Sequence, residues 1–362
     1  MTLKVIKLDE SDRNLWDTAL VKFPHAHPLN AYGWGKVREV DGWEASHFIA
    51  KKDNTIKGMV MVLNKKIPWI GFSIAYAPKG PIVQSEDRNV LKTLLERVRE
   101  ECKLKGAIFL RIDPNITDDR FDDRLDPFIE EGFIHLDQRW TFWNSPRDVY
   151  RIDLSKVSTE KELFNSLDRD ARRCIRKADR EGVTIRVAEN LKELKRFYEI
   201  FKAFSAGKGF ICRKYKYQEA LWNEYIVKGN GRLFLAIYNE KIIGGLVCLL
   251  FNRKCLAMHM GTPPKYSRLH TYYAYVWDSI RWAKERDCSW YSFRGVGTTP
   301  TQEYFKRKFR AHIVPLVGYY DMPINKPLYY ILNFTEFSLL PFTLKNLLNI
   351  RRHFKTFFKP SS

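Results

Sequence analysis

Lys306 is the residue of this chain whose neighbours best suit a lysine to chemistry. It directly follows Tyr304 and Phe305, and a β-type segment at residues 318–325 comes soon after it. Aromatic neighbours exclude water, and an ammonium group acts more strongly in such surroundings than in bulk water. The pattern therefore predicts that Lys306 stabilises an oxyanion in a transition state, with Tyr304 and Phe305 shaping the site.

Asp113 is the carboxylate best placed to receive a proton. It follows the apolar strand pattern at residues 107–112 and precedes Pro114 and Asn115. A carboxylate at a strand end can act as a general base. An aspartate in that position also commonly caps the turn that follows it, so both interpretations stay open.

The charge balance indicates polyanionic partners. The 362 residues carry 62 Lys and Arg against 42 Asp and Glu, a formal charge of +20. Such an excess attracts RNA, a nucleotide-linked precursor or an anionic membrane face. The hydrophobic content of 45% is ample for buried cores, and the length suits two domains.

The elements that must position these residues occur twice along the chain. A predicted hairpin at residues 47–63 has a counterpart at residues 233–250, and each is followed by an amphipathic helix (90–105, then 272–286) and a short strand (107–112, then 289–293). Self-similarity at this long period indicates duplicated domains. We expect an α+β (α/β) chain of two tandem domains with the acyltransferase fold called GNAT, at residues 1–149 (completed by a strand from 317–325) and 150–316.

A basic helix is predicted between the two halves, at residues 159–182. Thr159 and Glu162 form a capping-box pattern at its start. One face is apolar, and from Arg169 to Lys216 the chain has 15 Lys and Arg against 6 Asp and Glu. The basic face is either a solvated helix surface or a contact for RNA phosphates. Its cations include Arg172, Arg173, Arg176 and Lys177.

The tail at residues 326–362 differs in composition from the rest. Basic and aromatic residues interleave there, as in an amphipathic helix at an anionic membrane surface, although docking on the protein's own core is the alternative. The six cysteines have no metal-site spacing and are expected to be structural thiols. The N-terminus lacks the apolar region of a secretory signal, so we expect a cytoplasmic protein, either free or peripheral at the membrane.

Taken in order, several motifs resemble the Fem family (FemABX), which builds peptidoglycan interpeptide bridges. The pieces span nearly the whole chain, and together they are specific. They are Trp34-Gly35-Lys36, Tyr76 to Pro81, Leu110 to Pro114, Arg172 to Ala178, Arg213 with Tyr217, and Tyr304-Phe305-Lys306 through Asn325.

The resemblance implies an enzyme that moves an aminoacyl group from aminoacyl-tRNA to an amine of the peptidoglycan stem peptide. The acceptor would be UDP-muramyl-pentapeptide or a lipid-linked precursor. Lys36 and Arg213, with Trp34, Tyr76 and Tyr217, would bind that precursor, Lys306 would serve the transition state or the tRNA end, and the basic helix face would contact tRNA. An aminoacyl ester is already activated, so neither a covalent intermediate nor a cofactor or metal is expected.

The chain also departs from the family pattern. Lys308 and Arg310 stand where glycines are usual, Met258-His259-Met260-Gly261 replaces a Tyr-x-Tyr-Gly strand, and no coiled-coil arm interrupts residues 183–262. The acceptor therefore stays open, including another cell-envelope acceptor. Two further hypotheses stay open as well. One is a GNAT enzyme that uses acyl-CoA, although no glycine-rich pyrophosphate loop is evident, and the second is a non-catalytic RNA- or membrane-binding protein.

Overall fold

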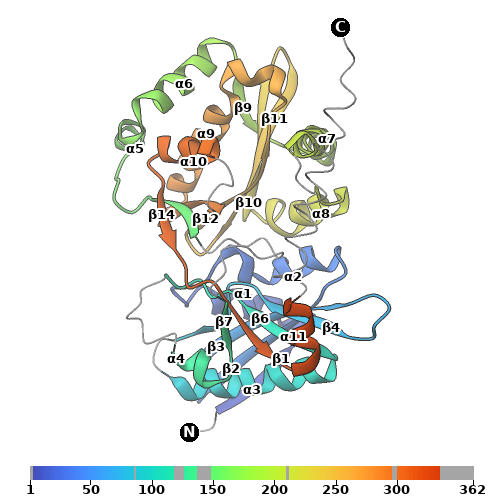
Figure 1. Ribbon diagram of the computed structural model, residues 1–362. Coiled ribbons are helices and arrows are strands. Elements are labelled where there is room, and N and C mark those ends of the chain that lie inside the picture. Colours follow the sequence, from blue (N-terminus) through green and yellow to red (C-terminus); the bar gives the residue numbers. More distant parts are fainter. Residues whose placement is uncertain are drawn as a thin grey trace.

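The computed structural model of the chain describes residues 3–84, 87–117, 126–136, 148–208, 212–295 and 300–334. Two mixed β-sheets with flanking helices form two halves, one above the other in Figure 1. The first sheet consists of β1 (Leu3–Leu8), β2 (Glu44–Lys52), β3 (Thr55–Lys66), β4 (Ser73–Ala77), β5 (Ile82–Val83), β6 (Ala107–Ile112), β7 (Ile134–Leu136) and β15 (Tyr319–Pro323). The second consists of β8 (Asp148–Asp153), β9 (Thr184–Val187), β10 (Gly231–Tyr238), β11 (Lys241–Phe251), β12 (Lys254–Gly261), β13 (Trp290–Gly295) and β14 (His312–Pro315).

The helices cover the faces of these sheets. Those of the first half are α1 (Arg13–Leu20), α2 (Tyr32–Glu39), α3 (Arg88–Leu104), α4 (Asp126–Glu130) and α11 (Lys326–Phe334). Those of the second half are α5 (Glu160–Ser166), α6 (Arg169–Arg180), α7 (Leu191–Lys208), α8 (Tyr215–Leu221), α9 (Thr271–Glu285) and α10 (Pro300–Lys308). Short helical turns are η1 (Glu10–Asp12), η2 (Pro28–Asn30), η3 (Trp222–Ile226) and η4 (Pro264–Leu269).

Both predicted hairpins are confirmed. β2 pairs with β3, and β10 pairs with β11, in antiparallel register. The two residues at each turn, Asp53-Asn54 and Asn239-Glu240, all have positive φ. Two-residue turns of that hand match the right-handed twist of the flanking strands, so they hold the register that buries one face of each strand. The predicted helices α3 and α9 and the strands β6 and β13 are also present, with ends shifted by at most two residues.

The two sheets correspond strand by strand, and the first sheet includes a strand from the C-terminal part of the chain. The runs β2-β3-β4-β6 and β10-β11-β12-β13 occupy equivalent positions, and each ends in a parallel pair. Next to β6 lies β15, from the C-terminal part of the chain, and next to β13 lies β8, the strand that begins the second half. The first sheet therefore depends on a strand that follows the whole second half in the sequence.

A buried ion pair holds the returning strand in the first sheet. Arg111 on β6 donates two hydrogen bonds to Asp321 on β15, at 2.7 and 2.8 Å. The two side chains are only 2% and 0% exposed.

We expect Arg111→Leu to lower the free energy of unfolding by about 3 kcal/mol, because it leaves the Asp321 carboxylate buried and without its principal partner. Urea denaturation of the variant measures this loss. The double change Arg111→Leu/Asp321→Leu should recover part of it, and a double variant no better than the single one would contradict this account.

The basic segment at residues 159–182 is two helices, so the prediction of one continuous helix is wrong. α5 begins at the expected capping box, in which Thr159 accepts from the Glu162 backbone. It ends at Leu167, whose backbone is extended, and Asp168 then caps the N-terminus of α6. Local hydrogen bonding by an aspartate side chain competes with helix continuation, which explains the break.

The two halves share one hydrophobic core. The same cluster of buried side chains includes Trp16 and Met61 of the first half and Phe197 and Leu249 of the second. Lys254 on β12 adds a polar tie, because its ammonium donates to the carbonyl oxygens of Pro24 and Ala26 at 2.5 and 2.6 Å. The interface therefore fixes the halves relative to each other.

His47 makes this core sensitive to acid. Its ring stacks on Tyr32 with centroids 4.1 Å apart, and burial, with lesser help from nearby Lys36 and Arg13, lowers its pKa from 6.5 to about 3. Between these two pKa values, His47 is therefore protonated in the unfolded chain and neutral in the folded chain. We expect stability to fall as the pH drops from 6.5 toward 3, by about 1.4 kcal/mol per pH unit from this group. Urea titrations should show a flatter dependence for His47→Phe, and an unchanged slope would contradict the assignment.

The start of the C-terminal tail docks on the first sheet. Tyr329 of α11 is buried against Ile108 and Phe109 of β6. Residues 335–362, the larger part of the predicted amphipathic tail, lie outside the described residues. Across the described ranges, none of the helices has the length and apolar content needed to cross a membrane.

Candidate functional site

Four of the predicted substrate-binding residues meet where the halves join. Trp34 on α2 and Tyr217 on α8 are buried and face each other edge to face, with centroids 6.4 Å apart. The Arg213 guanidinium lies over the Tyr217 ring at 4.9 Å. Tyr76, near the end of β4, packs against the same core cluster. Both halves thus supply side chains to one interdomain cluster.

Arg38 completes this cluster, although its role was not predicted. It lies one helical turn beyond Trp34 and above its ring, and its guanidinium reaches Asp41 at 3.3 Å. Arg213 forms an ion pair with the same Asp41 oxygen. Burial lowers the pKa of Arg38, and the neighbouring Arg213 lowers it further. Two guanidiniums on one carboxylate leave a positive charge uncompensated within the cluster, and arginine forks suit phosphate oxygens.

The remaining candidate cation of α2 points elsewhere. Lys36 lies beside Glu10 at 3.1 Å and Glu39 at 3.5 Å, rather than with Arg213. Positions 34 and 38 are four apart and share a helix face, whereas 36 does not share it. The helical period at Trp34 was the signal that would have identified Arg38 from the sequence.

Asp113 is buried and engaged by the segment that follows β4. Its carboxylate accepts from the Lys79 backbone at 2.7 Å and pairs with the Lys79 ammonium at 2.7 Å. Lys79 has a φ of +52°, a left-handed conformation that the double contact stabilises. Burial and the adjacent Asp113 carboxylate raise the pKa of Tyr76. Asp113 thus links Tyr76 to the ends of β4 and β6.

Lys306 lies on the other face of the second sheet. Its ammonium is 5.1 Å from the centre of the Tyr150 ring on β8, and Tyr150 belongs to the core cluster beneath α9. Phe305 packs on Tyr273, with centroids 5.0 Å apart. Tyr304 is exposed and lies beneath Lys308 at 4.7 Å. Tyr150 therefore takes the place beside Lys306 that was expected of Tyr304.

Lys308 ties α10 to the basic helix α6. Its ammonium pairs with Asp168 at 3.0 Å and Asp170 at 2.9 Å, in the first turn of α6. Hydrogen bonds to Asp170, Tyr304 and Asp168 raise the pKa of Lys308. The helix that carries Lys306 is thereby fixed against the start of the basic surface.

The four predicted tRNA contacts lie along α6 on this same side. Arg173 and Arg176 are exposed, whereas Arg172 and Lys177 are half-buried. The positive charges of Lys177 and Arg173, after burial, lower the pKa of His270 at the start of α9. A basic surface therefore leads from α6 toward α9 and α10.

In the second sheet, the parallel strands β12 and β13 diverge toward their carboxyl ends. The pairing of β12 with β13 runs from Lys254 to Leu256 against Trp290 to Ser292. β12 continues to Gly261 and pairs with β11 on its other side along its whole length. His259, in the diverging part of β12, lies against Phe201 at 5.0 Å and Tyr217 at 5.9 Å. His259 is half-buried beside the interdomain cluster.

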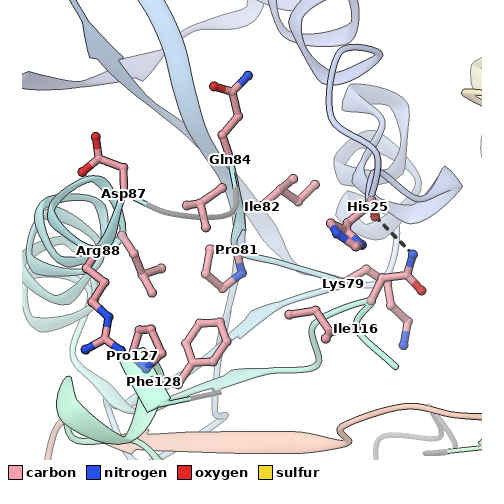
Figure 2. Close-up of a pocket in the computed structure, with 13 residues that line it drawn as sticks. His25, Lys79, Pro81, Ile82, Gln84, Asp87, Arg88, Ile116, Pro127 and Phe128 are labelled. Carbon is pink, nitrogen blue, oxygen red and sulfur yellow. Dashed lines mark hydrogen bonds between the residues drawn. The ribbon is translucent and has the colours of Figure 1, made fainter. Parts of the chain in front are cut away.

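A separate cavity of about 270 Å³ lies at the carboxyl ends of β4 and β6 (Figure 2). Figure 2 shows Asp87 and Arg88 at one side of it and His25 and Lys79 at the other. Asp87 caps α3 by accepting from Val90 and pairs with Lys52 at 2.7 Å. A carboxylate thus occupies the N-terminus of α3, a position that in other helices can bind an anion.

No group of three or more His, Cys, Asp or Glu side chains in the described ranges is arranged to share a metal ion. Of the six cysteines, five are buried, and Cys212 is half-buried.

Comparison with known proteins gives consistent results. The chain is 26% identical over 228 residues to Lipid II:glycine glycyltransferase of Staphylococcus aureus, a match that covers 62% of this chain and 53% of the relative. The chain thus spans about half the length of the curated relatives it matches.

Among solved structures, FemX superposes with a TM-score of 0.81 at 19% identity, covering 90% of this chain and 99% of FemX. A tandem GNAT protein from the clavulanic acid biosynthesis pathway superposes with a TM-score of 0.57 at 10% identity, covering 89% and 99% of the two chains. These likenesses show that the two mixed sheets form the fold of tandem GNAT proteins.

The family profile described as the FemAB family matches residues 20–241 and 232–336, which together are most of the chain. The motifs quoted from the sequence fall within those residues, as do the elements that carry the interdomain cluster. The chain belongs to the FemAB family.

Proposed function

We propose that this protein transfers an amino acid from aminoacyl-tRNA to an amine of the stem peptide of a peptidoglycan precursor. The observation that carries the proposal is the interdomain cluster, in which α2 and the segment before α8 each supply one guanidinium to a single carboxylate, Asp41. The S. aureus relative is by its name a glycyltransferase that acts on lipid II, which supports a precursor with a diphosphate as the acceptor.

The arginine pair, Arg38 and Arg213, would bind the diphosphate of the precursor. Arg213 is 42% exposed at its side chain and can turn toward a ligand, whereas Arg38 is 11% exposed and already held in place. Trp34 and Tyr217 form the apolar wall that fixes both guanidiniums. Lys36 would add a third charge if its ammonium leaves Glu10 and Glu39.

The donor would approach from the opposite side of the second sheet. Arg172, Arg173, Arg176 and Lys177 would contact tRNA phosphates, and the aminoacyl end would then lie near Lys306. The divergence of β12 from β13 supports a route by which the two reactants meet between the faces.

The reaction needs no covalent enzyme intermediate. The acceptor nitrogen attacks the ester carbonyl, a C–N bond forms, and the bond from that carbon to the ribose oxygen breaks. The nitrogen loses a proton and the 3′ end of the tRNA gains one. The Lys306 ammonium would stabilise the oxyanion of the tetrahedral intermediate. Formation of that intermediate is the step that a fixed positive charge accelerates most.

Asp113 has two possible duties in this scheme. In the present geometry its two oxygens contact the ammonium and the backbone amide of Lys79, and it adjoins Tyr76. Acting as the general base would require the acceptor ammonium to replace Lys79 as its partner. We therefore assign Asp113 first to positioning Tyr76 and the end of β4, and second to proton transfer.

Mass spectrometry of cell-wall muropeptides tests the function in the cell. Comparing cells with and without this protein, we expect branched muropeptides that carry added amino acids to disappear with it. The Lys306→Ala chain, produced at the same level, should fail to restore them. Identical muropeptides in both cells would contradict the proposed acceptor.

A further inference from the structure

One end of the first sheet carries large apolar side chains that face solvent. They come from three segments: the turn between β3 and β4, the end of α3, and α11. Trp69 is fully exposed and Leu104 is 80% exposed. The others are Ile70, Tyr330 and Ile331, at 49 to 60% exposure.

Backbone contacts hold these three segments together. The Ser73 amide, at the end of the β3–β4 turn, donates to the Gly106 carbonyl just after α3, at 2.9 Å. Before α11 the Asn325 amide donates to Ile108, also at 2.9 Å, and Tyr329 packs in the same small cluster as Phe72. In Figure 1 the turn, the end of α3 and α11 lie together at the lower right. The exposed apolar groups therefore form one surface, which we call the apical face.

Basic residues border the apical face. Lys66 precedes the turn, Lys103 lies in the last turn of α3 and Lys326 begins α11, and all three are exposed. The exposed Glu44 at this end is paired with Lys105. The chain continues from α11 into residues 335–362, whose sequence holds five Lys and Arg in its last 18 residues against no Asp or Glu.

We propose that the apical face docks on an anionic lipid bilayer. Contiguous exposed apolar groups mark interaction sites, and an indole at the tip of a turn suits the boundary between headgroups and acyl chains. Lysines around an apolar patch attract anionic headgroups, which a neutral protein partner would not require. Trp69 and Ile70 would enter the interface first, followed by Leu104 and the exposed side of α11.

Docking of the apical face would fix the distance between the membrane surface and the candidate site. The apical face lies at the start of β4, and Tyr76 lies three residues along that strand, about 10 Å further at the usual rise. A site at that height suits a precursor that is anchored in the same membrane. This consequence rests on the proposed function, whereas the docking itself does not.

Vesicle co-sedimentation of the full chain tests the proposal without any transfer reaction. Wild-type protein should sediment with vesicles that contain phosphatidylglycerol and much less with phosphatidylcholine alone. Trp69→Ala/Ile70→Ala should weaken binding about tenfold or more, since two apolar anchors are lost. Lys66→Gln/Lys326→Gln should weaken binding about tenfold on the anionic vesicles only.

Matched controls come from exposed residues of the second half. Val227→Ala removes an apolar group that is 67% exposed, and Lys192→Gln/Lys195→Gln removes two exposed charges of α7. Both should bind vesicles as wild type does, and all variants should transfer normally to a soluble, nucleotide-linked acceptor. Wild-type-like binding by the Trp69/Ile70 variant would overturn the proposal. A dimer that this variant abolishes, with no effect of lipid, would overturn it as well.

Discussion

Arg38→Ala/Arg213→Ala is expected to lower kcat/KM for a diphosphate-containing acceptor about a thousandfold. Each guanidinium can donate charge-assisted hydrogen bonds worth about 1.5–3 kcal/mol, and every 1.4 kcal/mol is a factor of ten. The loss should appear chiefly in KM for the acceptor, because the contact is made before the chemical step. Steady-state kinetics with varied acceptor and saturating aminoacyl-tRNA measures it.

Lys214→Ala/Lys216→Ala is the matched control, since it removes two charges from exposed positions beside Arg213. Its kcat/KM should stay within about a factor of three of wild type, as expected for rim charges. Equal losses in the two double variants would mean that general positive charge, not the arginine pair, binds the acceptor.

The single variants of α2 separate the two candidate cations. Arg38→Ala should cost more than Lys36→Ala, because Arg38 already lies beside Arg213 while Lys36 must first leave Glu10 and Glu39. The reverse order would show that α2 rearranges when the acceptor binds.

Lys306→Ala is expected to lower kcat about a hundredfold to a thousandfold, the usual cost of removing one oxyanion donor. Lys306→Arg should lose less, because it keeps the charge but alters its position. KM for the acceptor should change little, since Lys306 lies on the other face of the sheet from the arginine pair. Single-turnover assays with preformed aminoacyl-tRNA isolate this step.

Lys308→Ala serves as the comparison for Lys306, two residues away on the same helix. It releases α10 from Asp168 and Asp170, so the melting temperature should fall. Lys306→Ala should leave the melting temperature nearly unchanged. If kcat falls equally in both variants, then the position of α10, and not the Lys306 ammonium, carries the effect.

Local pattern explains which parts of the fold could be predicted. The hairpins, α3, α9 and the parallel strands follow from alternation, turn residues and helical period within short windows. A strand at residues 317–325 was expected to complete the first domain, but local pattern alone could not give its pairing, because β15 joins β6, some two hundred residues earlier in the chain. The strand-by-strand correspondence supports our inference that the two halves are diverged copies.

Motif spacing located the candidate site only in part. Trp34, Arg213 and Tyr217 lie together because α2 and α8 pack at the junction of the halves, and their role in binding stays a prediction. Arg38 lies outside the Trp-Gly-Lys motif, and only the helical period that starts at Trp34 points to it. The partner of Lys306 was misjudged for another reason: on a helix, residues two apart do not face each other, whereas residues four apart do, so Tyr304 lies against Lys308 instead.

The central claim is an amide-forming transfer that depends on charged tRNA, and a reaction with purified components tests it most directly. The protein would be incubated with radiolabelled aminoacyl-tRNA and either a lipid-linked or a nucleotide-linked muramyl-pentapeptide. We predict label in the stem peptide with wild-type protein, and almost none with Lys306→Ala or with free amino acid in place of the charged tRNA. Label that never leaves the tRNA for either precursor, across the full set of charged tRNAs, would contradict the account.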